Sequence, residues 1–339
     1  MAAVLAEITR GAIVESTHHG TVVAVDAGGK LVAHLGDPDL PLFFRSSAKP
    51  FQSVPVVTSG AADAFGLSTE ELAMVCASHS GTARHQAVVA SILAKAGVAE
   101  PDLRCGLDPP LDEEEKARVL LGVVPPSQVQ CECSGEHAGM LAACRAAGWP
   151  TDDYVAVDHP LQVEIRSIVA AACGVPPESL VIGTDGCGIP TFGATARAFA
   201  FAYAVMADPE GARWAGSIEQ RAALLRLRGA MAAHPELVDV DGTLDTDIMR
   251  ETGGKVIAKL GAEGLLTLAV PERRLGVAIS DAGGSQRGLG PAAVAFLEQL
   301  GLADAGAIAA IREAHSGAVT NFAGETVGEI RPAMTLALA

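Results

Sequence analysis

Aromatic residues and basic charges are both scarce in this chain. Phe, Trp and Tyr make up 4% of its 339 residues, so we expect a core of aliphatic and small side chains. Its 24 Lys and Arg residues face 40 Asp and Glu residues, which gives a net charge of -16. Such a surface repels the backbone of nucleic acids and anionic membrane surfaces. The composition therefore excludes both as expected partners and favours a small polar substrate.

Long apolar runs and secretion signals are also lacking. Apolar runs such as Val54 to Val57 and Ala196 to Met206 fall short of a membrane span or are interrupted by polar residues, and Glu7 interrupts the N-terminus before any long apolar run develops. Three of the seven cysteines, Cys76, Cys144 and Cys173, lie in apolar helical patterns typical of reduced, buried thiols. We therefore expect a cytoplasmic protein without a disulfide framework.

What the chain does contain is strand patterns at both ends and helical patterns between them. Residues Gly11 to Leu35 alternate around the turn signal Asp26–Lys30, which predicts a β-hairpin. Strand patterns return at Val256 to Lys259, Gly264 to Val270 and Leu275 to Ser280. We predict an α/β fold, with one mainly antiparallel sheet built from residues of about 11–45 and 255–339 and flanked by helices. We expect a helical subdomain (about 48–250) to be inserted, and residues 1–339 to form a single domain.

A serine precedes a lysine by three residues in Ser46-Ser47-Ala48-Lys49. A serine hydroxyl is a poor nucleophile, but a neutral lysine amine one helical turn away can take its proton without a histidine or a metal. Ser46 and Lys49 are therefore a candidate reaction centre. The pattern is short, and exposed helix-cap residues are the alternative interpretation.

Two further elements follow in the chain order of the serine β-lactamases and penicillin-binding enzymes. Ser78 lies in Ser78-His79-Ser80 after a predicted helix, and Lys259 lies at the end of a predicted strand. Acyl transfer needs a nucleophile with its base, a second hydroxyl to relay protons, and a cation beside the substrate. Ser78 and Lys259 supply the last two, although an ordinary surface lysine is the alternative for Lys259.

A second cluster contains zinc-ligand residue types. Two short glycine-containing loops can bring Cys133, Glu136 and Cys187 together as ligands, although unligated thiols are the alternative. His137 and Asp185 can instead orient a substrate by hydrogen bonds, or Asp185 can serve a plain turn. The chain has no Walker A or Rossmann glycine motif, so no organic cofactor is expected.

Five segments taken together resemble the Rhizobium etli-type L-asparaginases, the asparaginase II family. They occur in the order found in the family, and the resemblance extends from about Gly11 to the C-terminus. The segments are Arg45–Pro50, Cys76–Ser80, Cys133–Met140, Gly183–Cys187 and Lys259–Ala262.

The resemblance implies a fold similar to that of serine β-lactamases and glutaminases, and a homodimer. It also implies an L-asparaginase that converts L-asparagine to L-aspartate and ammonia through an acyl-serine. The implied catalytic groups are Ser46 with Lys49 and Ser78 with Lys259, the implied substrate-orienting residues are Arg45, His137 and Asp185, and the implied zinc ligands are Cys133, Glu136 and Cys187.

One position departs from the family pattern, which has lysine where this chain has Glu136. A carboxylate is already an anionic ligand, so the zinc site is expected to remain, but the charge beside the substrate is reversed. The zinc is not expected to be the hydrolytic group, because the Ser-Lys groups already provide nucleophile and base. Two other readings stay open: an altered or non-catalytic protein that binds zinc or amino acids, and a penicillin-recognising serine hydrolase.

Overall fold

The protein, described here by a computed structural model over residues 2–339, consists of two compact units. The first, the sheet unit, contains the segments up to Ser47, Ala194–Trp214 and the chain from Gly242 onward. The second, the helical unit, contains Ala48–Gly193 and Ala215–Asp241. Between residues 2 and 339, no helix has the length and apolar character that a membrane span requires.

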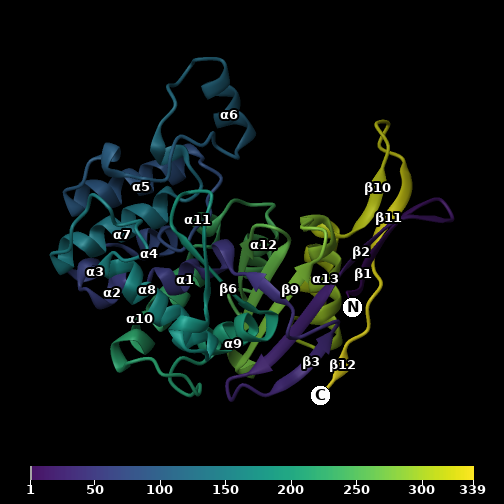
Figure 1. Ribbon diagram of the computed structural model, residues 1–339. Coiled ribbons are helices and arrows are strands. Elements are labelled where there is room, and N and C mark those ends of the chain that lie inside the picture. The colour runs from purple at the N-terminus through teal and green to yellow at the C-terminus, as the bar shows by residue number, and fades with distance from the viewer. Residues whose placement is uncertain (1) are drawn as a thin grey trace. The chain divides into compact units, whose positions relative to one another are not determined.

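The sheet unit is built on one antiparallel sheet whose strands come from both ends of the chain. The strand order is β10-β11-β1-β2-β9-β8-β7, and β3 pairs with both β2 and β12. Figure 1 shows the purple N-terminal strands lying beside the green and yellow C-terminal ones. The strands are β1 (Ala3–Arg10), β2 (Ile13–Asp26), β3 (Leu31–Leu35), β7 (Ile257–Gly261), β8 (Leu265–Val270), β9 (Leu275–Asp281), β10 (Gly317–Thr320), β11 (Thr326–Pro332) and β12 (Ala337–Leu338). The predicted antiparallel sheet of N- and C-terminal strands is confirmed.

The central strands are buried on both faces and carry aliphatic side chains. Helix α9 (Ala196–Ala207) packs against β2, β8 and β9. A Cβ atom on Gly276 of β9 would lie 2.0 Å from Ala200 O and from Ala204 N, so only glycine allows this close approach. The alanine-rich helix and the glycine explain how a core with few aromatic residues is filled. Helices α12 (Leu244–Glu251), α13 (Leu289–Gln299) and α14 (Ala305–His315) complete the unit.

Helices of the helical unit begin and end at residues that commonly mark helix ends. The Ser68 capping box opens α4, while Gly97, Gly148 and Gly174 end their helices in left-handed conformation. The helices are α1 (Lys49–Gln52), α2 (Val54–Thr58), α3 (Ala61–Ala64), α4 (Thr69–Met74), α5 (Ala83–Ala96), α6 (Glu113–Leu120), α7 (Ser134–Ala147), α8 (Pro160–Cys173), α10 (Ile218–Ala233) and α11 (Pro235–Val238). Strands β5 (Val181–Thr184) and β6 (Pro190–Thr195) pair in antiparallel fashion.

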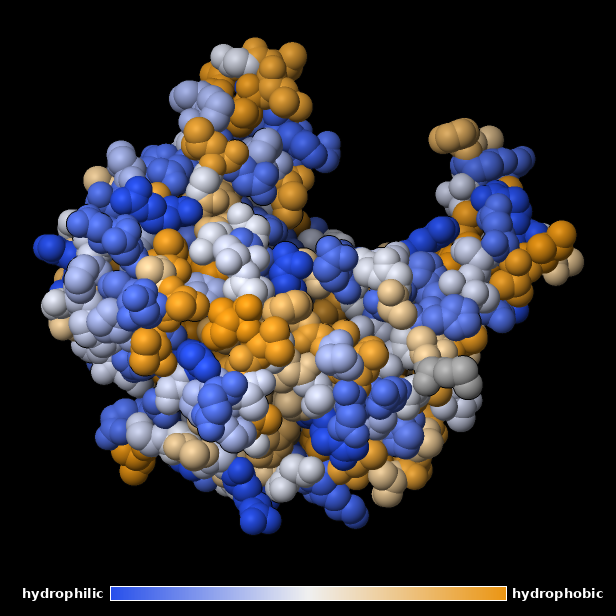
Figure 2. Space-filling model, in the orientation of Figure 1, coloured by the Kyte–Doolittle hydropathy of each residue, from blue (hydrophilic) through white to orange (hydrophobic). Residues whose placement is uncertain are grey.

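The segment that carries α6 exposes several large apolar side chains. Leu120 and Leu121 are 73% and 79% exposed, and Leu111 and Val123 are also exposed. Figure 2 shows apolar surface, in orange, at the end of the segment that Figure 1 labels α6. The interior of the helical unit is by contrast made of small and aliphatic side chains from α2, α4, α5, α7 and α8.

A buried carboxylate of α4 ties this helix to α5. Glu71 accepts hydrogen bonds from Lys95 Nζ at 2.6 Å and from Ser91 Oγ at 2.8 Å. Burial raises the pKa of Glu71, but these bonds and the one from Ser68 outweigh it, so the pKa lies below its ordinary 4.5. The stabilisation is therefore present above about pH 4.5 and is lost as the pH falls through the lower folded-state value.

We expect Glu71→Gln to lower the free energy of unfolding by about 1–3 kcal/mol at pH 7, because a buried charge-assisted network loses its anion. The difference from the wild type should shrink as the pH falls below about 4.5. Urea unfolding at a series of pH values measures it. Glu70→Gln is the control, because Glu70 pairs with Arg84 at the surface. A pH-independent difference would contradict the assignment.

Candidate active site

The segment that carries Ser46 is held against strand β7 within the sheet unit. It forms a short 3₁₀ turn, Arg45–Ala48, in which Arg45 has a φ of 47° and Ser46 is half-buried. Ser47 Oγ donates a hydrogen bond to Lys259 O at 3.1 Å, and Tyr203 Oη donates one to Ser47 O at 2.9 Å. The strained turn at Arg45 is thus held in place by two buried hydrogen bonds of Ser47, one through its hydroxyl and one through its carbonyl oxygen.

The glycine of Lys259-Leu260-Gly261 has a steric role in this contact. A Cβ atom on Gly261 would lie 2.9 Å from Ser47 Oγ and 3.1 Å from Phe44 O, so a larger residue would push the strand away from the serine segment. Lys259, two residues earlier on β7, is therefore carried by a strand that lies directly beside the segment of Ser46.

Lys259 is fully buried in the sheet unit and faces a fully buried acid, Asp245 of α12. Its Nζ lies 3.4 Å from Asp245 Oδ2 and donates to Leu260 O at 3.1 Å. The same Oδ2 accepts the Leu260 N–H at 2.9 Å, and Oδ1 accepts the Thr246 N–H at 3.0 Å. An ammonium group and a carboxylate that share buried hydrogen bonds stabilise each other's charge. These contacts hold the ammonium group of Lys259 in one position.

Lys49 has an equivalent environment in the helical unit. It is 2% exposed, and its Nζ donates to Ala77 O at 2.8 Å and to Cys133 Sγ at 3.2 Å, with Glu136 Oε2 at 3.6 Å. Burial by itself lowers the pKa of Lys49, but the negative charges that Cys133 and Glu136 carry when ionised reverse this and hold the pKa well above its ordinary value. A lysine must be neutral to take the proton of a serine, and the immediate surroundings of Lys49 favour its charged form instead.

Glu136 reaches Lys49 because α7 begins in close contact with the end of α4. A Cβ atom on Gly135 would lie 2.4 Å from Met74 O, and one on Gly139 would lie 2.7 Å from Val75 Cγ1. The two glycines, one helical turn apart, therefore let the first turn of α7 sit deep in the unit. This gives a physical reason for the spacing of glycine in the segment Cys133–Met140.

His137 follows on the same turn and is fully buried. Its Nδ1 lies 2.6 Å from Tyr154 Oη, which itself accepts the Arg104 N–H at 2.9 Å. All these groups are satisfied when Tyr154 donates to Nδ1, which assigns the proton of the imidazole to Nε2. Burial, together with the charge of Lys49, lowers the pKa of His137 to about 3, so the ring is neutral. Its Nε2 has no hydrogen-bond partner among residues 2–339 and remains available as a donor.

Ser78 has a buried hydroxyl for which the described part of the chain supplies no hydrogen-bond partner. Its backbone N–H is fixed by Val238 O at 3.0 Å, and the residue before it, Ala77, accepts the bond from Lys49. The neighbouring His79 is by contrast fully engaged, with Nε2 at 2.8 Å from Ser134 Oγ and Nδ1 accepting from Gly81 N. Ser78 therefore has the free hydroxyl expected of a reacting or relaying group.

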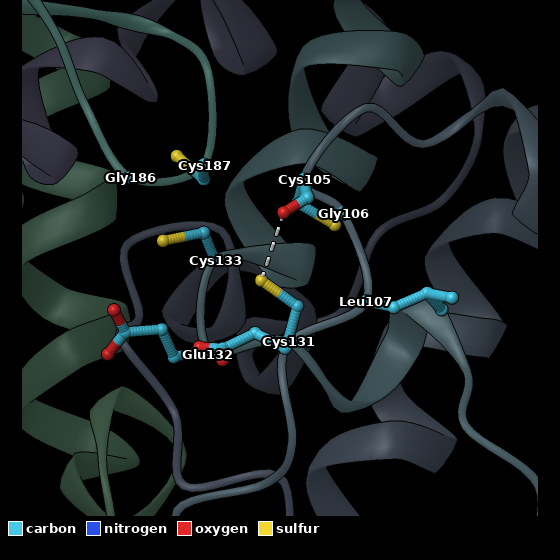
Figure 3. Close-up of a pocket in the computed structure, with 9 residues that line it drawn as sticks. Cys105, Gly106, Leu107, Cys131, Glu132, Cys133, Gly186 and Cys187 are labelled. Atoms are coloured by element: carbon cyan, nitrogen blue, oxygen red, sulfur yellow. Dashed lines mark hydrogen bonds between the residues drawn. The ribbon is translucent and has the colours of Figure 1, made fainter.

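Cys133, Glu136 and Cys187 come together as predicted. One ligand atom from each lies within 4.8 Å of the others, and all three residues are buried. A pocket of about 420 Å³ opens onto this cluster, and Figure 3 shows the sulfur atoms of Cys133 and Cys187 side by side in its wall. Asp185 begins the turn that presents Cys187, with its carboxylate accepting the Gly186 N–H at 2.7 Å.

Comparison with known proteins places these residues in a family. The chain matches the family L-asparaginase II over residues 6–332. It belongs to the L-asparaginase II family. This match covers every residue of the candidate site and supports an amidohydrolase. A comparison with curated proteins found no match.

Solved structures similar to this L-asparaginase II family member include two forms of Mglu. The native form is 14% identical with a TM-score of 0.36, covering 84% of this chain and 64% of that chain. The glutamate form is also 14% identical, with a TM-score of 0.38, covering 86% of this chain and 63% of that one. The family member thus spans less than two thirds of the length of these chains.

The two Ser-Lys pairs that the sequence predicted are divided between the units of this asparaginase II fold. Ser46 and Lys259 belong to the sheet unit, while Lys49 and Ser78 belong to the helical unit. The sequence did not identify Asp245, which contacts Lys259, or Tyr154, which contacts His137. Neither residue lies in the segments that resemble the family. A single acid or tyrosine in a helical region gives no sequence signal of its role.

Proposed function

We propose that this protein hydrolyses L-asparagine to L-aspartate and ammonia through an acyl intermediate on Ser46. The observation that carries the proposal is the pair of buried lysines in a member of the L-asparaginase II family. Lys49 and Lys259 are each at most 2% exposed, and each contacts a carboxylate. Two fully buried lysines are costly for a fold and are typical of a reaction centre.

The reaction assigns one task to each group. Ser46 Oγ attacks the carbon of the side-chain amide and gives its proton to the hydroxyl of Ser78, which passes its own proton to the amide nitrogen. The C–N bond breaks and ammonia leaves. Water then cleaves the ester and restores the serine. Lys259, whose strand lies beside the Ser46 segment, supplies positive charge for the developing oxyanion. Ser78 relays the proton through its free hydroxyl.

Substrate orientation is assigned to Arg45, His137 and Asp185. A guanidinium suits the α-carboxylate of asparagine, and a carboxylate suits its α-ammonium group. The neutral His137 offers its Nε2 proton to an oxygen of the substrate, which its hydrogen bond with Tyr154 supports. These roles need no organic cofactor.

The donor set of Cys133, Glu136 and Cys187 fits a zinc ion. Two thiolates and one carboxylate are ordinary zinc ligands, and together they balance the charge of a dication and of the adjacent Lys49 ammonium. In the metal-free protein the Cys131 hydrogen bond and burial raise the pKa of Cys133 to about 12, so binding must release the thiol proton. A bound zinc would supply fixed positive charge that orders this loop, rather than the nucleophile.

A coupled ammonia assay tests the proposal. We expect release of ammonia from L-asparagine, and a lower kcat/KM for L-glutamine, whose extra methylene shifts the amide away from a fixed serine by more than the site tolerates. Thermal shift on the same samples supplies a second measurement.

Stabilisation by asparagine without ammonia release would instead identify a protein that binds the amino acid without hydrolysing it. The reversed charge at Glu136 makes this the second candidate. Acylation by a labelled penicillin, without release of ammonia from asparagine, would identify a penicillin-recognising serine hydrolase. Either outcome would overturn the asparaginase assignment.

A further inference from the structure

The proposed function gives no role to His79, a fully buried histidine between Ser78 and Ser80. The hydroxyl of Ser78 has no hydrogen-bond partner within residues 2–339, so nothing that it contacts there fixes its place. A polar ring is retained in the interior of a protein when its hydrogen bonds are made. The partners of the two ring nitrogens of His79 therefore indicate what this residue does.

Both ring nitrogens of His79 have a partner, and these partners fix the position of the ring proton. Nδ1 accepts the Gly81 N–H at 3.1 Å, which places the proton on Nε2. Nε2 lies 2.8 Å from Ser134 Oγ. Because Ser134 Oγ donates its own proton to Val129 O at 3.0 Å, it accepts the proton of His79. Burial lowers the pKa of His79 well below its ordinary value, in keeping with a neutral ring.

The bond between His79 and Ser134 joins the segment of Ser78 to the start of α7. Ser134 is the first residue of that helix, whose first turn also carries His137. The backbone makes a second contact beside it, since the His79 N–H donates to Glu132 O at 3.0 Å. All these residues belong to the helical unit.

The other contacts of the Ser78 segment do not involve α7. The Ser78 N–H donates to Val238 O at 3.0 Å, and Ala77 O accepts from Lys49 Nζ at 2.8 Å. These bonds hold the backbone of the segment on its other sides. The ring of His79 is the side chain that ties it to the helix of His137.

We propose that His79 is a positioning residue, which fixes the Ser78 hydroxyl relative to the first turn of α7 through its hydrogen bond with Ser134. This inference rests on the proposed function, in which Ser78 passes a proton from Ser46 to the amide nitrogen. Each transfer requires its donor and acceptor to lie within hydrogen-bond distance. A displacement of about 1 Å at Ser78 is therefore expected to slow the chemical step by about 10²-fold. His79 itself exchanges no proton with the substrate.

Two substitutions separate the two hydrogen bonds of His79. Asparagine can still accept the N–H two residues on, but its side chain is too short to reach Ser134. Glutamine places an amide N–H near the position of Nε2 and can donate to Ser134. We expect His79→Asn to lower kcat by about 10²-fold and His79→Gln to keep most of the turnover. Stabilisation of the protein by asparagine in thermal shift should be retained in both, because binding does not depend on the relay.

His159→Asn is the matched control in the same unit. Like His79, the buried His159 accepts the N–H two residues on through Nδ1, from Leu161 at 3.2 Å, and its Nε2 donates to Pro150 O at 3.1 Å. Its loss of stability in urea unfolding should be similar, while kcat stays within about twofold of the wild type. Ser134→Ala removes the proposed bond from the opposite side, should lower kcat as His79→Asn does, and replaces that variant if it does not fold.

The decisive measurement is kcat for ammonia release in the background of Ser78→Ala. This change alone should lower kcat by about 10²–10⁴-fold, and adding His79→Asn should lower it no further, because His79 acts through Ser78. A further loss in the double variant, or equal losses of kcat in His79→Asn and His159→Asn, would overturn the positioning role and leave the asparaginase assignment standing. Full turnover in Ser78→Ala would remove the relay and this inference together, and absence of ammonia release by the wild type would remove the proposed function itself.

Discussion

Ser46→Ala should reduce ammonia release from L-asparagine by about 10⁴-fold or more, because removal of a nucleophile leaves only the binding and electrostatic contributions to catalysis. The fold should survive the change. Ser46 is half-buried, and the contacts that hold its segment are made by Ser47 with Lys259 and Tyr203. The loss should appear in kcat, while stabilisation of the protein by asparagine is retained.

The matched control is Ser59→Ala, a serine of the helical unit whose hydroxyl accepts the Ala61 N–H at 3.3 Å. It should leave turnover within about twofold of the wild type, as expected for a change outside the reaction centre. Mass spectrometry of wild-type protein quenched during turnover should find the aspartyl group on the peptide that contains Ser46. Turnover retained by Ser46→Ala, or an acyl group on another residue, would remove Ser46 from the mechanism.

Much of the fold could be predicted because its signals are local. Alternation around Asp26–Lys30 and in the strands near residues 256–280 marks strands, and the need to bury their apolar faces joins both ends of the chain in one sheet. The first strand, β1, was missed because it precedes the hairpin turn and pairs with β11, more than 300 residues away. Whether the two units act as one domain stays a prediction.

The sequence predicted the candidate site only where the residue types themselves indicate a function. Cys133, Glu136 and Cys187 are of types that bind metal ions, and the structure brings them together. Asp245 does not, because an acid in a helix is usually a surface residue, and only the tertiary fold places it against Lys259 without exposure to water. The contact of Lys49 with Glu136 was also missed, since it depends on the close packing that Gly135 allows.

The buried pair of Lys259 and Asp245 makes the largest expected contribution to stability in the site. Asp245→Asn or Lys259→Met alone should destabilise the protein by about 3–5 kcal/mol, because each leaves an uncompensated charge at 0% exposure. The amide in Asp245→Asn can still accept the Leu260 N–H, so its effect isolates the charge from the hydrogen bond to the backbone. Urea unfolding of the single variants measures both values.

The double variant Asp245→Asn/Lys259→Met separates the ion pair from the role of the lysine in catalysis. Removal of both charges leaves no buried ion, so its destabilisation should be smaller than the sum of the single effects by about 1–3 kcal/mol. Its ammonia release should nevertheless stay as low as that of Lys259→Met, because stability is recovered while the cation beside the Ser46 segment is not. Additive stabilities would show that the two groups do not act as a pair, and recovery of turnover along with stability would show that Lys259 has only a structural role.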